Sequence, residues 1–192
     1  AMVRGIPVIA AAVGNLPQLI EHQTSGYIAK NETELNTCLK NWLRLSLKGK
    51  TAVVTGAASG MGLAMSRRFV EAGMNVVLSD IDENKLTEAT RLITASGGRA
   101  IGVLADVALE GDHSMLLDRA IDEFGIVNVV CLNAGVTGSI GRSWTLTKQD
   151  WDWTLGILLD GVINGIRTFV PHLIDHGDGH VVTTASIAGH VS

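Results

Sequence analysis

Residues 50–62 read Lys-Thr-Ala-Val-Val-Thr-Gly-Ala-Ala-Ser-Gly-Met-Gly, and this stretch decides the fold. Residues 51–55 form a run rich in β-branched side chains, which predicts a buried parallel strand. Three glycines follow, Gly56, Gly60 and Gly62, and then an apolar segment with helical periodicity. A strand, a glycine turn and a helix start together predict a phosphate site, because glycines allow close backbone approach and the free amides of a helix start face an anion.

An acidic residue follows the second predicted strand. That strand covers residues 75–79 and ends in Asp80, 18 residues after Gly62. A carboxylate there can accept hydrogen bonds from both hydroxyls of a ribose and would repel a 2′-phosphate, so the spacing favours NAD over NADP. Asp80 could instead cap the next helix, but Asp82 fits that role better.

The composition is that of a globular protein, with 46% hydrophobic and 18% charged residues among 192. A net charge of −4 without a basic run argues against nucleic acid and anionic membranes, so we expect a small-molecule partner. The apolar runs are strand-sized and no signal peptide is recognisable, which predicts no membrane span and a cytoplasmic location. Cys38 and Cys131 are too few for a disulfide framework or a metal site, and we interpret both as reduced structural thiols.

Strands and helices alternate from residue 47 onward. The predicted strands cover residues 51–55, 75–79, 99–105, 127–132 and 180–186, and the predicted helices cover residues 61–72, 83–95, 110–124 and 148–176. Such alternation predicts an α/β fold with a doubly wound, Rossmann-like parallel sheet and a ligand crevice at the carboxyl ends of its strands. Because the strand at residues 180–186 is the last, we expect the sheet to be incomplete at its C-terminal side, with an uncovered edge.

Two further strand ends carry suggestive residues. Asp106 and Val107 follow the third predicted strand, and Asn133, Ala134 and Gly135 follow the fourth. An aspartate at a strand end can accept from an adenine amino group, and a turn of small residues lets a cofactor lie against the backbone. Either group alone is more often an ordinary turn, so the prediction depends on their occurring together.

The segment at residues 148–176 is the strongest predicted helix. Its apolar residues fall on one stripe at helical spacing: Trp151, Leu155, Leu158, Leu159, Val162, Ile166, Phe169, Val170 and Leu173. Asp152, Asp160 and Asn164 lie off that stripe. Gly156, Gly161 and Gly165 recur within the helix and predict close approach of another element, either a second subunit or the sheet of the same chain.

Taken in order, these motifs resemble the short-chain dehydrogenase/reductase superfamily over residues 47–192. The resemblance implies that the pyrophosphate turn is lined by Gly56, Ser59, Gly60, Met61 and Gly62. It implies that Asp80 and Ile81 hold the adenosine ribose and flank the adenine, and that Asp106 and Val107 bind the edge of the adenine. It further implies that the nicotinamide ribose is backed by Asn133, Ala134 and Gly135. It also implies that Ser186 is the catalytic serine and that the long helix packs between subunits of a homo-oligomer. The implied function is NAD-dependent hydride transfer to or from an alcohol or carbonyl substrate.

The chain departs from this family in two respects. The family's acid/base tyrosine lies about thirteen residues after the serine, with a lysine four positions beyond, and the only tyrosine here is Tyr27. We therefore expect no turnover by this chain, which leaves open a non-catalytic dinucleotide-binding module or an inert fusion of two fragments. Leu158 replaces the family's helix asparagine, and we interpret it as a core residue.

Residues 1–45 read as a separate short α/β unit. They predict strands at residues 7–11 and 27–30 and helices at residues 16–22 and 32–45. This unit resembles part of the nucleotide-sugar-binding domain of retaining glycosyltransferases, which leaves a glycosyltransferase remnant as a third alternative. Its two strands could also cover the open sheet edge.

Overall fold

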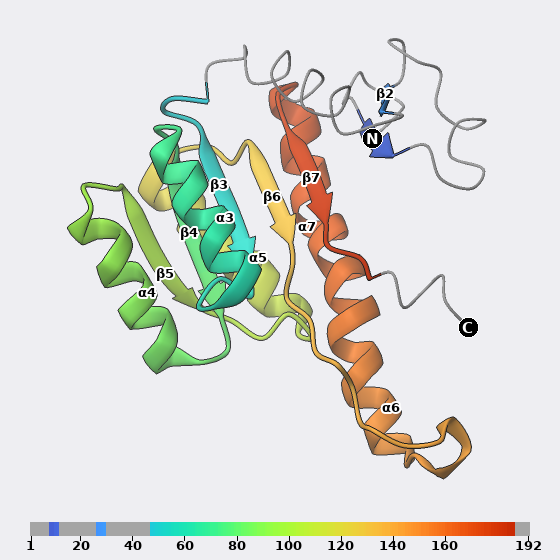
Figure 1. Ribbon diagram of the computed structural model, residues 1–192. Helices are drawn as coiled ribbons and strands as arrows, with labels where there is room; N and C mark the ends of the chain where they lie inside the picture. The colour runs from blue at the N-terminus through green and yellow to red at the C-terminus, as the bar shows by residue number, and fades with distance from the viewer. Residues whose placement is uncertain (1–7, 12–25, 30–46, 187–192) are drawn as a thin grey trace.

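The structure is a computed structural model that describes residues 8–11, 26–29 and 47–186 (Figure 1). Two short strands come first, β1 (Val8–Ala11) and β2 (Gly26–Ala29). The main body then alternates β3 (Thr51–Thr55), α3 (Gly60–Glu71), β4 (Asn75–Asp80), α4 (Glu83–Ala95), β5 (Ala100–Leu104), α5 (Glu110–Phe124), β6 (Val129–Leu132), a short 3₁₀ turn (Ser143–Thr145), α6 (Lys148–Leu155), a π-helical turn (Gly156–Asp160), α7 (Gly161–His176) and β7 (His180–Thr183).

The five strands β3 to β7 form one parallel sheet in the order β5-β4-β3-β6-β7. The chain builds outward from β3 through β4 to β5, and it then returns to the other side of β3 with β6 and β7. This reversal between β3 and β6 is a topological switch point, where the carboxyl ends of parallel strands open a crevice. The predicted doubly wound parallel sheet is confirmed.

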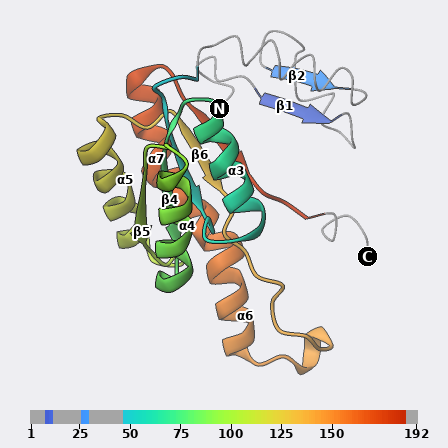
Figure 2. The ribbon, with the colours of Figure 1, turned by 60° about the vertical axis from the view of Figure 1, so that its left-hand side comes forward.

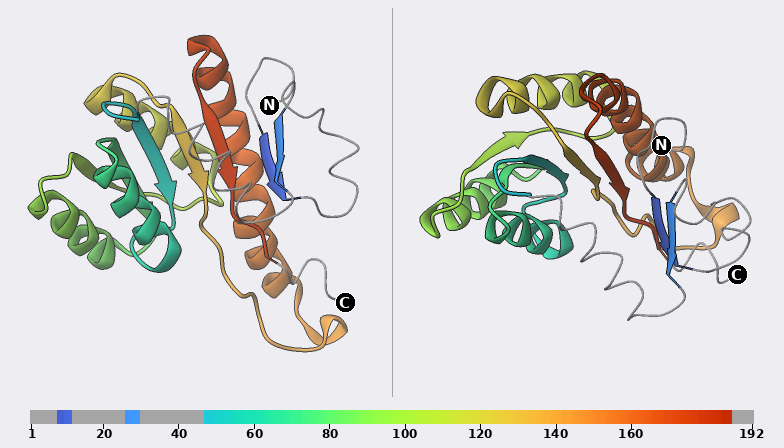
Figure 3. Two further views of the ribbon diagram at one scale, coloured as in Figure 1. Left: turned by 45° about the horizontal axis from the view of Figure 1, so that its top comes forward. Right: turned by 90° about the horizontal axis from the view of Figure 1, so that it is seen from above.

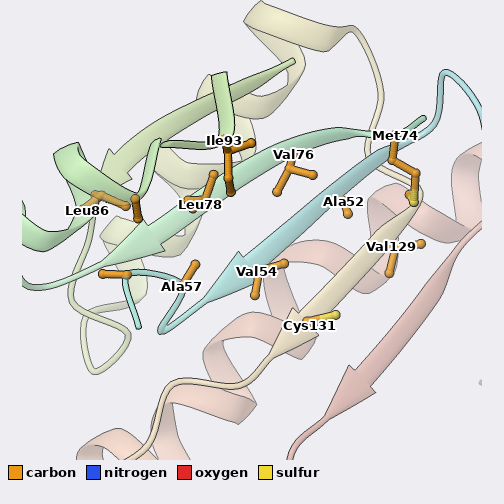
Figure 4. Close-up of a cluster of buried hydrophobic side chains, with 12 residues drawn as sticks. Ala52, Val54, Ala57, Met74, Val76, Leu78, Leu86, Ile93, Val129 and Cys131 are labelled. Carbon is orange, nitrogen blue, oxygen red and sulfur yellow. The ribbon is translucent and has the colours of Figure 1, made fainter. Parts of the chain in front are cut away.

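Helices cover both faces of this sheet, with α3 and α4 on one face and α5 and α7 on the other (Figure 3). The first face encloses a buried cluster that joins Val54, Leu78 and Cys131 of the strands to Leu86 and Ile93 of α4 (Figure 4). The second face packs another set of strand residues against Leu116, Ala120, Phe169 and Leu173 of α5 and α7. Strands buried on both faces explain the continuous apolar runs in the sequence.

Most element boundaries agree with the sequence. The strand at residues 51–55 and the helices at residues 83–95 and 110–124 were predicted to the residue. The last strand was predicted too long, because β7 ends at Thr183. Its ladder continues by one bond, from the Thr184 amide to the Leu132 carbonyl at 3.1 Å, and then the backbone leaves the sheet before Ser186.

The long helix at residues 148–176 comprises α6 and α7 (Figure 2). A π-helical turn interrupts it at its middle. Its three glycines face atoms of the same chain, since a Cβ at Gly161 would lie 3.0 Å from Val107 and one at Gly165 would lie 2.4 Å from Leu132. At Gly156 the nearest atom would be the Ala108 Cβ, at 3.6 Å. Close packing within the same chain therefore accounts for Gly161 and Gly165.

Only the second half of the predicted apolar stripe is in the core. Phe169 and Leu173 are buried, whereas Trp151, Leu155, Leu158 and Leu159 are between 41% and 51% exposed. The interpretation of Leu158 as a core residue was wrong for this reason. Asn164 was placed off the apolar stripe, yet it is buried and its amide donates to the Ala108 carbonyl at 3.4 Å. Neither α6 nor the π-helical turn contains a buried residue, so only α7 contributes to the core.

By length and composition alone, the helix spanning residues 148–176 is long and apolar enough to cross a membrane. The expectation that no segment reaches this length and hydropathy was therefore wrong. One such helix is weak evidence of a membrane span, because core helices of globular proteins pass the same test. Here the helix packs against α5, β6 and β7.

Strands β1 and β2 pair with each other in parallel, from Val8 opposite Gly26 to Ala11 opposite Ala29. They form their own two-stranded sheet, so they do not extend the main sheet beyond β7. The hypothesis that they cover this open edge was therefore wrong. The remaining predictions for residues 1–45, including Cys38, the two helices and the glycosyltransferase-like unit, fall mostly outside the described residues.

Candidate functional site

The turn between β3 and α3 is built so tightly that two of its glycines have no room for a side chain. A Cβ at Gly62 would lie 2.1 Å from the carbonyl oxygen of Gly56, and a Cβ at Gly56 would lie 2.8 Å from the Cα of Ala134. The first contact brings the start of α3 directly over the turn. The second brings the turn against the segment that follows β6.

The start of α3 has features that suit an anion. Ser59 is its N-cap residue but makes no side-chain cap hydrogen bond, and the first turn contains no acidic residue. Gly60 has φ of +53°, and a Cβ there would meet nothing within 4 Å, so the backbone at this residue borders open space. The first amides of a helix have no partner within the helix and carry the positive end of its dipole. They therefore remain available to an external anion.

The Asp80 carboxylate lies at the end of β4, next to β3, and helps to shape the turn. Its Oδ2 accepts from the Ala58 amide at 3.0 Å, and its Oδ1 accepts from the Asp82 amide at 3.1 Å. An ionised carboxylate has about four acceptor sites, so two oxygens with one bond each can still accept from ligand hydroxyls. Sequence reasoning did not anticipate these two backbone bonds.

Asp82 is the cap of α4, as the sequence predicted. Its side chain accepts from the Lys85 amide at 3.1 Å and pairs with the Lys85 ammonium at 2.7 Å. These hydrogen bonds hold the pKa of the Asp82 carboxyl below its usual range. Because Asp82 caps the helix, Asp80 is free of that task and lines the cavity described below.

Asn133 ties three strand ends together at the centre of the site. Its side-chain amide donates to the Thr55 carbonyl at 3.0 Å, and its Oδ1 accepts from the Thr184 hydroxyl at 3.0 Å. In return, the Thr55 hydroxyl accepts from the amides of Asn133 and Ala134, at 3.0 and 3.1 Å. The ends of β3, β6 and β7 are thereby held in one fixed arrangement.

These strand ends surround one cavity of about 350 Å³, which we call the main cavity. All twelve residues predicted to bind a cofactor line it, namely Gly56, Ser59, Gly60, Met61, Gly62, Asp80, Ile81, Asp106, Val107, Asn133, Ala134 and Gly135. Ser79, Ala105, Val136 and Ile157 line it as well and were not predicted. The first three adjoin predicted residues in sequence, whereas Ile157 reaches the cavity from the π-helical turn, which no local signal indicated.

Ser186 does not line the main cavity. It is exposed and lies three residues beyond the end of β7. The prediction that it shares the crevice with the glycine turn depended on a strand that continues to residue 186. The structure therefore brings the predicted cofactor residues together without the predicted catalytic serine.

Leu158 lies beside the nicotinamide end of the predicted site. It is 44% exposed, and its Cδ2 would be 3.4 Å from a Cβ at Gly135. The position where the family has an asparagine is thus next to the cavity in this chain and carries an apolar side chain. Among the described residues, no group of three or more His, Cys, Asp or Glu side chains could hold a metal ion.

Comparison with known proteins identifies this arrangement. The family model described as short chain dehydrogenase matches residues 50–192. The chain therefore belongs to the short-chain dehydrogenase family, whose members are oxidoreductases that bind nicotinamide dinucleotides.

Individual relatives agree with the family. An uncharacterized oxidoreductase of Listeria innocua is 34% identical over 76% of this chain and 58% of its own length. A 1-deoxy-11-beta-hydroxypentalenate dehydrogenase of Streptomyces exfoliatus is 37% identical over 77% of this chain and 54% of its own length. A crystal structure of a short-chain dehydrogenase/reductase from Burkholderia phymatum in complex with NAD has a TM-score of 0.75 at 38% identity, covering 77% of this chain and 53% of that one. The chain thus spans little more than half the length of these relatives.

Proposed function

We propose that residues 47–192 are the cofactor-binding part of an NAD-dependent oxidoreductase that transfers hydride between nicotinamide and an alcohol or carbonyl substrate. The observation that carries this proposal is the main cavity, because it joins the free amides at the start of α3 to the Asp80 carboxylate in one continuous wall. A dinucleotide requires both features, the amides for its diphosphate and the carboxylate for a ribose.

Each part of the cofactor has a wall of matching chemistry. Residues 59–62 would hold the diphosphate, since the N-cap of α3 has no internal hydrogen bond and no nearby acid competes for its amides. Asp80 and Ile81 would hold the adenosine ribose, and Asp106 and Val107 would bind the adenine edge. Asn133, Ala134 and Gly135 would back the nicotinamide ribose. When bound, the nicotinamide ring accepts or supplies the hydride.

The carboxylate of Asp80 favours NAD over NADP. Two like charges about 4 Å apart repel by about 4 kcal/mol at an effective dielectric constant of about 20, before screening by salt. A 2′-phosphate beside Asp80 would meet this repulsion, whereas two ribose hydroxyls would donate hydrogen bonds to the carboxylate. Selectivity for the unphosphorylated cofactor follows from this one side chain.

Calorimetric titration of the protein with NADH and with NADPH tests this proposal. We expect NADPH to bind at least about tenfold more weakly than NADH, which corresponds to only about 1.4 kcal/mol of the repulsion. Asp80→Ala should reduce the difference in affinity between NADH and NADPH. The control is Asp82→Ala, which removes a neighbouring carboxylate outside the cavity. Equal affinities in the wild-type protein would contradict the assignment of Asp80.

Cofactor binding, rather than turnover, is the property that we propose to measure in this chain. The sequence contains one tyrosine, Tyr27, so residues 47–192 supply no tyrosine to move the substrate proton. The role of Ser186 in orienting a substrate oxygen remains a prediction from the family resemblance.

A binding-only role is the second candidate, and two observations favour it: Leu158 stands beside Gly135 in place of a polar residue, and Ser186 lies outside the main cavity. Oxidation of alcohols by the protein together with any residues that follow Ser192 would rule it out.

Association with a second copy is also part of the proposal. Large apolar side chains remain exposed along α6, the π-helical turn and α7, namely Trp151, Leu155, Leu159, Ile163 and Ile166. We call this group of residues the outer stripe. Its exposure supports a homo-oligomer of the complete protein, because large exposed apolar patches are typical of interaction sites. The cytoplasmic location stays a prediction from the sequence.

A further inference from the structure

The turn at residues 106–109, between β5 and α5, forms one wall of the main cavity through Asp106 and Val107. Side chains from two helices hold its backbone. The Asp112 carboxylate accepts from the Asp106 amide at 2.7 Å, and the amide of Asn164 donates to the Ala108 carbonyl at 3.4 Å. Between these two contacts, the ring of His113 forms a hydrogen bond with the Val107 carbonyl.

His113 is a buried side chain with one defined partner. It is 1% exposed, and its Nε2 lies 3.0 Å from the Val107 carbonyl oxygen. Because a carbonyl can only accept, Nε2 must carry the proton in this hydrogen bond. The other ring nitrogen, Nδ1, is buried without a hydrogen-bond partner among the described residues, and the ring packs edge-on against Phe169.

This environment suits the neutral ring. Burial lowers the pKa of His113, and the Val107 carbonyl and the Asp112 carboxylate oppose that shift without cancelling it. An apolar side chain would fill the same space in α5 without leaving a buried nitrogen unpaired. The unpaired Nδ1 of the histidine destabilises the packing, whereas the hydrogen bond from its Nε2 stabilises the turn.

We propose that His113 is a positioning residue that fixes the wall of the main cavity at Asp106 and Val107, and so shapes the adenosine end of the cofactor site. This inference rests on the proposed function for the identity of the ligand. Without the Nε2 donor, the half-buried Val107 carbonyl would lose this hydrogen bond. The peptide could then satisfy its oxygen by rotating toward the open cavity, where it would obstruct the adenine.

Two substitutions separate the hydrogen bond from the packing. His113→Leu keeps an apolar side chain of similar size against Phe169 and removes the donor. His113→Gln keeps a nitrogen donor at a reach close to that of Nε2. We expect His113→Leu to weaken binding of both NADH and ADP-ribose by about tenfold, the size of one lost net hydrogen bond, and His113→Gln to restore most of that loss.

Amide hydrogen exchange of the ligand-free protein gives a second result that does not depend on the ligand. We expect the amides of Ala108 and Leu109 to exchange faster in His113→Leu than in the wild type, and to regain protection in His113→Gln, while Val53 in β3 is unchanged. Exchange and affinity in His113→Leu equal to wild type would overturn the proposal, as would equal losses in both variants. If the wild type binds no NADH, the proposed function fails, and the exchange comparison alone decides the role of His113.

Discussion

Replacing Gly62 by alanine tests whether α3 must begin directly over the glycine turn. The new Cβ would lie 2.1 Å from the Gly56 carbonyl oxygen and 2.9 Å from the Ala57 Cα. Both neighbours are backbone atoms, so only a movement of the turn or of the helix can relieve the overlap. Overpacking of this kind typically costs about 1 to 3 kcal/mol, and we expect the upper part of that range because no flexible side chain can yield.

The same movement would displace the amides proposed to bind the diphosphate. We therefore expect NADH affinity to fall by at least about tenfold, or about 1.4 kcal/mol, in addition to the loss of stability. Urea denaturation measures the free energy of unfolding, and calorimetric titration under native conditions measures the affinity.

Gly60 and Gly97 provide a matched pair that separates the backbone cost from the site. Both have positive φ, +53° and +86°, and a Cβ would meet nothing within 4 Å at either position. Alanine should therefore cost a similar amount at each, about 1 kcal/mol for a left-handed residue with a side chain. Only Gly60 lines the main cavity, so only Gly60→Ala should weaken NADH binding. Unchanged stability and affinity in Gly62→Ala, or an equal loss of affinity in Gly97→Ala, would refute this reasoning.

Three further predictions concern other parts of the molecule. Burial lowers the pKa of His180 from 6.5 to about 4, so the unfolded state binds more protons than the folded state between these pH values. The free energy of unfolding should therefore fall by up to about 3 kcal/mol as the pH is lowered from 6.5 to 4. His180→Leu should reduce this dependence of the unfolding free energy on pH, measured by urea denaturation, and an unchanged dependence would contradict the prediction. Burial raises the pKa of the Cys131 thiol to about 12, so iodoacetamide at pH 8 should label Cys131 only after unfolding, as peptide mass spectrometry would show, and labelling of the native protein would contradict this. Leu159→Glu on the outer stripe should shift any oligomer toward monomer in analytical ultracentrifugation, whereas Leu92→Glu on α4 should not. Equal effects of the two substitutions would exclude the outer stripe as the contact between subunits.

Much of the fold could be predicted because local signals and tertiary structure agree. The run at residues 51–55 is buried on both faces of the sheet, and Asp82 caps α4 as its position before the helix indicated. The set of cofactor residues followed from the rule that carboxyl ends of parallel strands meet at one edge. That rule needs only the order of strands and the residues that end them, both of which the sequence supplies.

The remainder depends on packing between distant residues. The π-helical turn at Gly156–Asp160 has no local signature, and neither this turn nor α6 contains a buried residue. Leu158 is exposed with the rest of this part of the helix, although its spacing was that of a core residue. The burial of His113 does have a signal in the sequence, since it lies three and seven positions before Leu116 and Ala120 on the buried stripe of α5. A histidine on such a stripe must find a partner, and here the partner is a carbonyl of the cavity wall.

Amide chemical shifts provide the most direct test of the dinucleotide site. In a ¹⁵N-labelled sample titrated with NADH, we expect the amides of Ser59, Gly60 and Gly62 to shift together and to saturate with a single affinity. The amides of Ser96 and Gly97, which line a separate hollow between α3 and α4, should not move. Shifts confined to Ser96 and Gly97, or no saturable shift at the start of α3, would contradict the assignment of the main cavity to a nicotinamide dinucleotide.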